Sequence, residues 1–201
     1  MKLHWSPKSP YVRKVMVCVH ELGLGQRIDC VRTVAAMAQP NAVLMQDNPL
    51  SKIPALVLDD GSVLFDSLVI CDYLDHIATG RLFPSPGTAR WHALRWHALG
   101  NGLTDLLILW RNERERTAPL PALTAAFEHK TWACLDRLED ETPALAAGGF
   151  TIGAIAVCCA LGYADYRFDA LSWRSRAPRL AQWLAVQMQR PSLQQTAPSD
   201  A

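Results

Sequence analysis

The sequence lacks an excess of either charge, a long apolar run and the motifs of a metal or redox centre. Twenty basic residues stand against 19 acidic ones, which gives a formal net charge of +1. Nucleic acids and anionic membranes ordinarily require a basic excess. No apolar run approaches the roughly 20 residues of a membrane span, and the first residues do not follow the pattern of a secretory signal peptide. We therefore expect neither nucleic acid nor a membrane as the main partner.

The six cysteines form no Cys-x-x-Cys pair. A metal-binding spacing is missing as well, because His92 and His97 lie five residues apart, about 140° around a helix, and no His-Glu-x-x-His occurs. We interpret the cysteines as reduced, buried thiols. Reduced cysteines predict a cytoplasmic protein, and the missing metal-binding spacing predicts that it holds no metal ion.

The sequence does contain a change of pattern near residue 80. Before it, strand and helix signals alternate, and two prolines leave room for only a short irregular helix between 34 and 50. Half of the residues are hydrophobic, which is enough for a sizeable core. Strands are expected at residues 2–5, 28–33, 55–58 and 62–65, and helices at 10–22 and 67–78.

Residues 81–87 have the composition of a linker, and every later signal is helical. The sequence thus predicts an α/β domain over 1–80, with helices on a mixed four-stranded sheet, and an all-α domain over 88–201. The polar residues 191–201 are expected to form a frayed tail. The long helices are expected at residues 88–116, 122–146, 151–166 and 177–190.

The segment Ser9-Pro10-Tyr11-Val12 stands where a thioredoxin-like redox enzyme would carry Cys-Pro-Tyr-Cys. It follows a short strand and opens an apolar-periodic helix, so Ser9 is the expected N-cap and Pro10 the first helical residue. The start of a helix stabilises an anion through its free amides and its dipole. Because a hydroxyl replaces the sulfur, any thiol at this position must arrive with a ligand.

Six motifs follow one another along the chain, namely Ser9-Pro10-Tyr11 with Arg13, residues 48–56, Asp66-Ser67 with Ile70 and Tyr73-Leu74, Leu82-Phe83-Pro84, Gly149-Phe150-Thr151-Ile152 and Arg190-Pro191-Ser192. This ordered set resembles the cytosolic glutathione transferases over nearly the whole chain. The serine start is most similar to the serine-type enzymes, namely the tau and zeta classes and related bacterial proteins. The resemblance implies a thioredoxin-like domain that binds glutathione as co-substrate, a helical domain with a pocket for a small hydrophobic electrophile, a homodimer and a role in detoxification.

The resemblance implies a task for each residue that would bind glutathione. Ile53-Pro54 is similar to the family's cis-proline, which would turn the N–H and C=O of Ile53 toward a bound peptide. Asp66 would pair with the γ-glutamyl ammonium group, and Ser67, as the expected helix cap, would bind the neighbouring carboxylate. Lys52 would meet a carboxylate or the glutathione backbone. A trans proline, a plain strand-to-helix cap and a solvated lysine are the simpler alternatives.

By the same resemblance, Ser9 carries the chemistry. A free thiol has a pKa of about 8.5, and lowering it by about two units needs roughly 2.7 kcal/mol. One hydroxyl hydrogen bond to an anion contributes about 1.5–3 kcal/mol, and a helix N-terminus adds up to about 1 kcal/mol. Ser9 is therefore expected to donate a hydrogen bond to the glutathione thiolate, with a simple N-cap serine as the alternative. Ser6 and Tyr11 are possible accessory donors.

Two further functions share these motifs: a glutathione-dependent isomerase of the zeta type, and a non-catalytic protein that binds glutathione in regulation. The fold alone does not separate them from a transferase. The chain departs from the family pattern at the apolar helix, where Thr151 is present but Ala154 stands at the acidic position of the capping box. We expect this departure to remove about 0.5–1 kcal/mol of local helix stability without affecting function.

Overall fold

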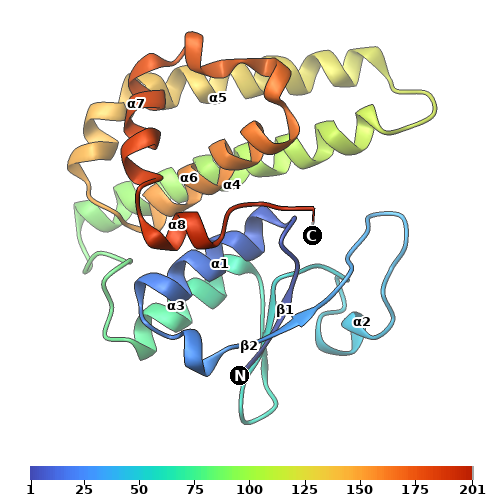
Figure 1. Ribbon diagram of the computed structural model, residues 1–201, viewed down its shortest axis with the longest axis vertical. Coiled ribbons are helices and arrows are strands. Elements are labelled where there is room, and N and C mark those ends of the chain that lie inside the picture. The colour runs from blue at the N-terminus through green and yellow to red at the C-terminus, as the bar shows by residue number, and fades with distance from the viewer. Residues whose placement is uncertain (201) are drawn as a thin grey trace. The chain divides into compact units, whose positions relative to one another are not determined.

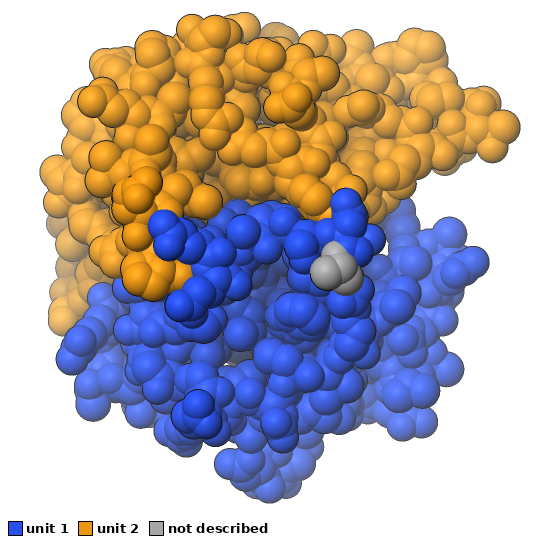
Figure 2. Space-filling view, in the orientation of Figure 1, with its two compact units in different colours: residues 1–83, 192–201 blue, residues 84–191 orange. Residues whose placement is uncertain are grey.

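The computed structural model describes residues 1–200, which fold as two compact units (Figure 2). The first unit contains residues 1–83 together with the C-terminal segment from residue 192, and the second contains residues 84–191. Each unit has its own set of elements, so the two are described separately. The first is an α/β unit and the second is entirely helical.

The first unit is built on a mixed four-stranded sheet with the strand order β2-β1-β3-β4. β1 (Lys2–Trp5) is parallel to β2 (Asp29–Arg32) and antiparallel to β3 (Ala55–Val57), which is antiparallel to β4 (Val63–Leu64). The strands lie where the sequence predicted them, and the last three are shorter than expected. The predicted mixed sheet is confirmed.

Helices α1 (Pro10–Glu21) and α3 (Ser67–Ile77) pack against each other beside the sheet, and the short α2 (Leu44–Asp47) lies apart from them (Figure 1). The N-cap of α1 is Ser9, as predicted. The N-cap of α3 is Asp66, so the expectation that Ser67 caps this helix is wrong. The backbone of Asp66 is extended and its carboxylate accepts the N–H of Leu68 at 2.9 Å, whereas Ser67 is already helical.

The C-terminal segment differs from the frayed tail that we predicted for the helical domain. Residues Pro191–Gln195 form helix α8, in which Leu193 is fully buried. The Ser192 hydroxyl donates to Glu21 at 2.5 Å, and the Leu193 carbonyl accepts a hydrogen bond from the Arg13 guanidinium at 3.1 Å. Both partners belong to α1. Contacts with the first unit therefore order this segment, and its own polar composition gave no sign of them.

The second unit is all helical, as predicted. Helix α4 (Thr88–Arg114) packs against both α5 (Pro121–Ala147) and α6 (Ile152–Arg167), and α6 is buried along most of its length. Thr151 is the N-cap of α6, and its side chain makes no capping hydrogen bond. The helices are α4 (Thr88–Arg114), α5 (Pro121–Ala147), α6 (Ile152–Arg167) and α7 (Pro178–Gln187), with single 3₁₀ turns at Asp169–Leu171 and Trp173–Ser175.

Over residues 1–200, no helix combines the length and the apolarity needed to cross a membrane. The same residues contain no group of three His, Cys, Asp or Glu side chains placed to hold a metal ion. Within residues 1–200 no disulfide joins the six cysteines, and four of them are buried, while Cys30 is exposed and Cys134 is half-buried. Desolvation by neighbouring atoms raises the pKa of the Cys30 and Cys134 thiols, and the charge of Asp29 is a second cause at Cys30.

Helices α4 and α6 approach each other closely at two glycines. A Cβ atom on Gly100 would lie 2.7 Å from the carbonyl carbon of Ala156, and one on Gly153 would lie 2.5 Å from the carbonyl oxygen of Ala93. These obstacles are backbone atoms of the facing helix, which cannot shift without separating the two helices. We expect Gly153→Ala to lower the free energy of unfolding by about 1–3 kcal/mol, measured by denaturant unfolding.

Gly102 offers a matched control within α4. A Cβ atom there would meet no atom within 4 Å, so Gly102→Ala should be neutral or stabilise the protein by up to about 1 kcal/mol through helix propensity. Equal destabilisation by the two substitutions would show that close helix packing is not the reason for glycine at position 153.

Candidate functional site

The predicted site residues lie on segments that meet at one edge of the sheet. Because β1 and β3 are antiparallel, with His4 opposite Ala55, the end of β1 lies beside the start of β3. In the same way, Leu64 at the end of β4 lies opposite Leu56 near the start of β3. The loop after β1, the residues before β3 and the residues after β4 therefore emerge together. These segments carry Ser6 and Ser9, Lys52-Ile53-Pro54, and Asp66-Ser67.

Ser9 lies at the first of these segments and is only partly buried. Its Oγ accepts the N–H of Val12 at 3.3 Å, so the hydroxyl proton remains available for a further acceptor. Ser6 lies in the same loop, where its Oγ is 3.4 Å from the N–H of Lys8, and Tyr11 lies within the first turn of α1. Of the three hydroxyls, that of Ser9 is the one placed at the start of the helix, where the free amides favour an anion.

The second segment contains the Ile53–Pro54 peptide bond, which is cis as predicted. Within residues 1–200, neither the N–H nor the C=O of Ile53 has a hydrogen-bond partner, and the residue is half-buried. Lys52 is exposed, and its ammonium group has no ion pair within the same residues. A free donor and a free acceptor on one residue are what an added peptide strand requires.

Asn48 holds the turn that presents this segment. Its side chain is 1% exposed, donates to the carbonyl of Lys52 at 2.8 Å and accepts the N–H of Leu50 at 3.1 Å. Asn48 belongs to one of the sequence motifs, but no role was predicted for it. The signal was available, because an asparagine side chain in a turn commonly bonds to its own backbone two residues further on.

The third segment places groups of opposite polarity beside each other. The Oδ1 atom of Asp66 caps α3, and its exposed carboxylate has a second oxygen free to accept. The hydroxyl of Ser67 has no hydrogen-bond partner within residues 1–200, although the residue is only 2% exposed. The peptide bond between Phe65 and Asp66 is cis, which the sequence did not predict. A carboxylate oxygen that can accept hydrogen bonds from a cation lies next to N–H and O–H groups that can donate to an anion. This arrangement suits the ammonium and carboxylate groups of an amino acid.

A buried histidine close to these segments was missed by the sequence analysis. His4 is 4% exposed, and its Nδ1 lies 2.8 Å from Thr33 Oγ1 while its Nε2 lies 2.7 Å from Asp47 Oδ2. Lys2 donates to the same carboxylate oxygen at 2.9 Å. The hydrogen bond with His4, followed by that from Lys2, lowers the pKa of Asp47 below its ordinary value. No local pattern reveals this cluster, because its members lie 29 and 43 residues from His4.

The lowered pKa of Asp47 predicts a loss of stability in acid. A carboxyl group whose pKa is lower in the folded state stabilises the fold above its unfolded pKa of about 3.9, and this contribution disappears as the pH falls through the folded value. We expect Asp47→Asn to be less stable than the natural protein by about 1–3 kcal/mol at neutral pH. The difference should shrink below about pH 4. Urea unfolding across this pH range measures it, and a constant difference would contradict the assignment.

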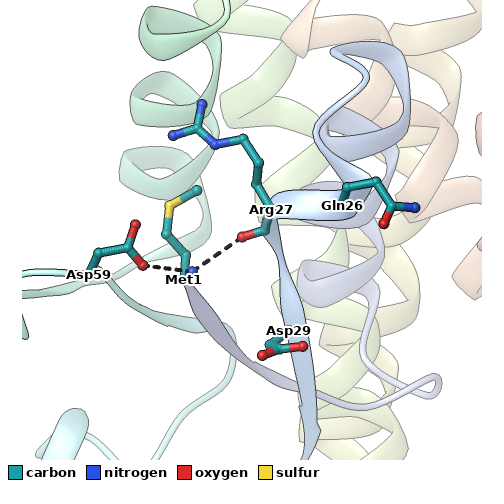
Figure 3. A pocket seen from close by; sticks show the side chains of 5 residues that line it. All are labelled: Met1, Gln26, Arg27, Asp29 and Asp59. Carbon is teal, nitrogen blue, oxygen red and sulfur yellow. Dashed lines mark hydrogen bonds and ion pairs between the residues drawn. The ribbon is translucent and has the colours of Figure 1, made fainter.

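Ser9 does not line either of the two pockets described next, both of which lie in the first unit. A pocket of about 260 Å³ opens at the opposite edge of the sheet, where β1 begins (Figure 3). The amino group of Met1 there donates to Asp59 at 2.9 Å and to the carbonyl of Arg27 at 3.2 Å, so these groups satisfy one another. A pocket of about 180 Å³ is lined by residues 5–7, one side of α1 and residues 195–197 and 199. It includes Ser6, which lies in the same loop as Ser9.

Comparison with known proteins gives matches over both units. The family model described as "Glutathione S-transferase, N-terminal domain" matches residues 8–77, and the one described as "Glutathione S-transferase, C-terminal domain" matches residues 121–185. A curated relative, the uncharacterized GST-like protein YibF of Escherichia coli K12, is 30% identical over 209 residues, covering 100% of both chains.

Solved structures match as well. A glutathione transferase family member from Pseudomonas fluorescens Pf-5 with bound glutathione is 44% identical, with a TM-score of 0.95 over 98% of each chain. A structure from the same organism with bound S-(propanoic acid)-glutathione is 42% identical, with a TM-score of 0.90 over 99% of this chain and 100% of that one. The predicted fold, a thioredoxin-like domain followed by a helical domain, is confirmed. The N-terminal match spans Ser9, residues 52–54 and Asp66-Ser67.

Proposed function

The chain belongs to the glutathione S-transferase family, and from this premise we propose that it is a glutathione transferase that activates the thiol of glutathione for attack on a small electrophile. One observation carries the proposal: three segments with unsatisfied polar groups emerge at the same edge of the sheet. A relative that is 44% identical has glutathione bound, which supports the same ligand here.

Glutathione would bind through groups that the fold leaves available. The free oxygen of Asp66 would accept the γ-glutamyl ammonium group, and the Ser67 hydroxyl and amide would donate to the adjacent carboxylate. The N–H and C=O of Ile53 would pair with the cysteinyl backbone of the tripeptide as a short antiparallel strand does. The ammonium group of Lys52 would meet a carboxylate or the peptide backbone. These contacts are supported by the lack of other partners at Ile53 and Lys52 within residues 1–200.

The chemical step would begin with loss of the thiol proton to water. The Ser9 hydroxyl would donate a hydrogen bond to the resulting thiolate, which therefore forms at a lower pH. The sulfur lone pair would then form a bond to an electrophilic carbon. A leaving group departs with its bonding electrons, or a conjugated double bond takes up the electron pair and then a proton from water. A relative with bound S-(propanoic acid)-glutathione supports a site that accepts a glutathione conjugate.

The electrophile is proposed to be small and hydrophobic, the active form a homodimer and the role detoxification. The lack of a disulfide among the six cysteines of residues 1–200 supports a reducing compartment, and thus the cytoplasm. Sedimentation equilibrium of the full chain tests the dimer, which a single species at the monomer mass of 22.3 kDa would exclude.

The function is tested by binding and turnover on the same preparation. Calorimetric titration with glutathione should show one site for each chain, and conjugation should be detected with halogenated aromatic or epoxide substrates. Binding without any turnover would refute the transferase and favour a regulatory protein. Isomerisation of maleyl substrates without conjugation would instead favour the zeta-type isomerase. Absence of glutathione binding would refute all three.

A further inference from the structure

The segment between β2 and β3 is weakly anchored by apolar contacts. Its one helix is the short α2, and within residues 34–50 the buried side chains are those of Leu44 and Asn48. Val34 and Val43 are each 70% exposed. A segment with so few buried contacts depends on its polar contacts for its position.

The imidazole of His4 supplies such contacts at both ends of the segment. Alternate residues of a strand point to opposite faces, so Lys2 and His4 share the face of β1 that meets α2. One ring nitrogen of His4 bonds to Thr33, directly after β2, and the other bonds to Asp47, the last residue of α2. A planar, buried ring thereby ties the beginning of the segment to its end.

Asp47 is adjacent to the turn that presents the proposed glutathione contacts. The next residue, Asn48, bonds through its side chain to the Lys52 carbonyl at 2.8 Å, and its own carbonyl accepts the N–H of Ser51 at 2.9 Å. On the other side of the same turn, the backbone of His4 is paired with Ala55. His4 therefore reaches residues 48–54 from both directions, through Asp47 by its side chain and through Ala55 by its backbone.

We propose that His4 is a positioning residue for the glutathione site, holding residues 33–52 on the sheet so that Lys52 and Ile53 are presented to the tripeptide. The inference rests on the proposed function. His4 itself is buried and acts through Asp47. Its side chain would contribute to glutathione affinity without taking part in the chemistry at the thiol.

The test compares His4→Leu with His4→Gln in the full-length protein. Leucine removes both hydrogen bonds, and we expect the Kd for glutathione to rise about tenfold while kcat at saturating glutathione stays within about twofold. Glutamine keeps a donor toward Asp47, so its Kd should stay within about threefold of the natural value. Lys2→Met is the control, because the partly exposed Lys2–Asp47 ion pair contributes little, and its Kd should not change.

A comparison of single and double variants shows whether His4 affects glutathione binding through Asp47. If His4 acts through Asp47, then Asp47→Ala should weaken binding to the same extent as His4→Leu, and the double variant should be no weaker than either. Additive losses, or equal affinity of His4→Leu and the natural protein, would overturn the proposal while the proposed function stands. Failure of the natural protein to bind glutathione would instead remove the function itself. If His4→Leu does not fold, Asp47→Ala takes its place, because His4 is proposed to act through Asp47, and a Kd of Asp47→Ala equal to the natural value would overturn the proposal.

Discussion

Substitution of Ser9 by alanine should raise the thiol pKa of bound glutathione by about one to two units and lower kcat/KM by about ten- to a hundredfold. The expectation follows from a hydroxyl at the start of α1 that accepts the Val12 amide at 3.3 Å and retains its own proton for the sulfur. A hydrogen bond to a charged acceptor contributes about 1.5–3 kcal/mol, and 1.36 kcal/mol corresponds to one pKa unit. The ultraviolet absorbance of the thiolate, followed against pH in the complex, gives the pKa directly.

Ser9 also caps α1, so the loss of catalysis must be separated from a loss of helix stability. Replacing a capping serine by alanine lowers the free energy of unfolding by about 0.5–2 kcal/mol, whereas glycine lowers it by only a few tenths. Ser9→Gly should therefore lose the activity of Ser9→Ala at nearly natural stability, and Ser9→Thr should keep both the cap and the hydroxyl. Ser6→Ala serves as the control for the neighbouring hydroxyl. An unchanged thiol pKa in Ser9→Gly would refute the proposed mechanism.

Features with local causes could be predicted from the sequence. The cap at Ser9 follows from a serine before a proline and an apolar-periodic run, and the structure has it. The order of strands and helices follows from changes in hydrophobic period. The cis bond before Pro54 was implied by the resemblance of residues 48–56 to a known family, and no local rule would have supplied it.

Features that depend on distant partners could not be predicted. Thr33 and Asp47 meet His4 only because β2 runs parallel to β1 and α2 returns to the sheet, and the sequence gives the sheet register no local marker. The order of α8 depends on contacts of Ser192 and Leu193 with α1, more than 170 residues earlier. The N-cap of α3 could not be predicted from residue type alone, because Asp66 and Ser67 are both good capping residues. The backbone geometry selects the aspartate.

Asp66 caps α3 and is also proposed to bind the γ-glutamyl ammonium group of glutathione. Substitution of Asp66 is therefore the second change for which we expect a large effect. Asparagine caps a helix about as well as aspartate does, but it carries no charge for the γ-glutamyl ammonium group. We expect Asp66→Asn to raise the Kd for glutathione by about ten- to a hundredfold, which corresponds to a charged hydrogen bond of about 1.5–3 kcal/mol. Its free energy of unfolding should stay within about 0.5 kcal/mol of the natural value. Calorimetric titration and urea unfolding measure the two quantities.

A glutathione analogue without the α-amino group shows whether the charge pair is the cause. The analogue should bind the natural protein about as weakly as glutathione binds Asp66→Asn, and the substitution should change its affinity little, since the pair is already absent. Asp66→Ala should lose the same glutathione affinity and, in addition, about 1 kcal/mol of stability with the cap at Leu68. If Asp66→Asn binds glutathione as tightly as the natural protein, then Asp66 is a helix cap alone and the ammonium group binds elsewhere.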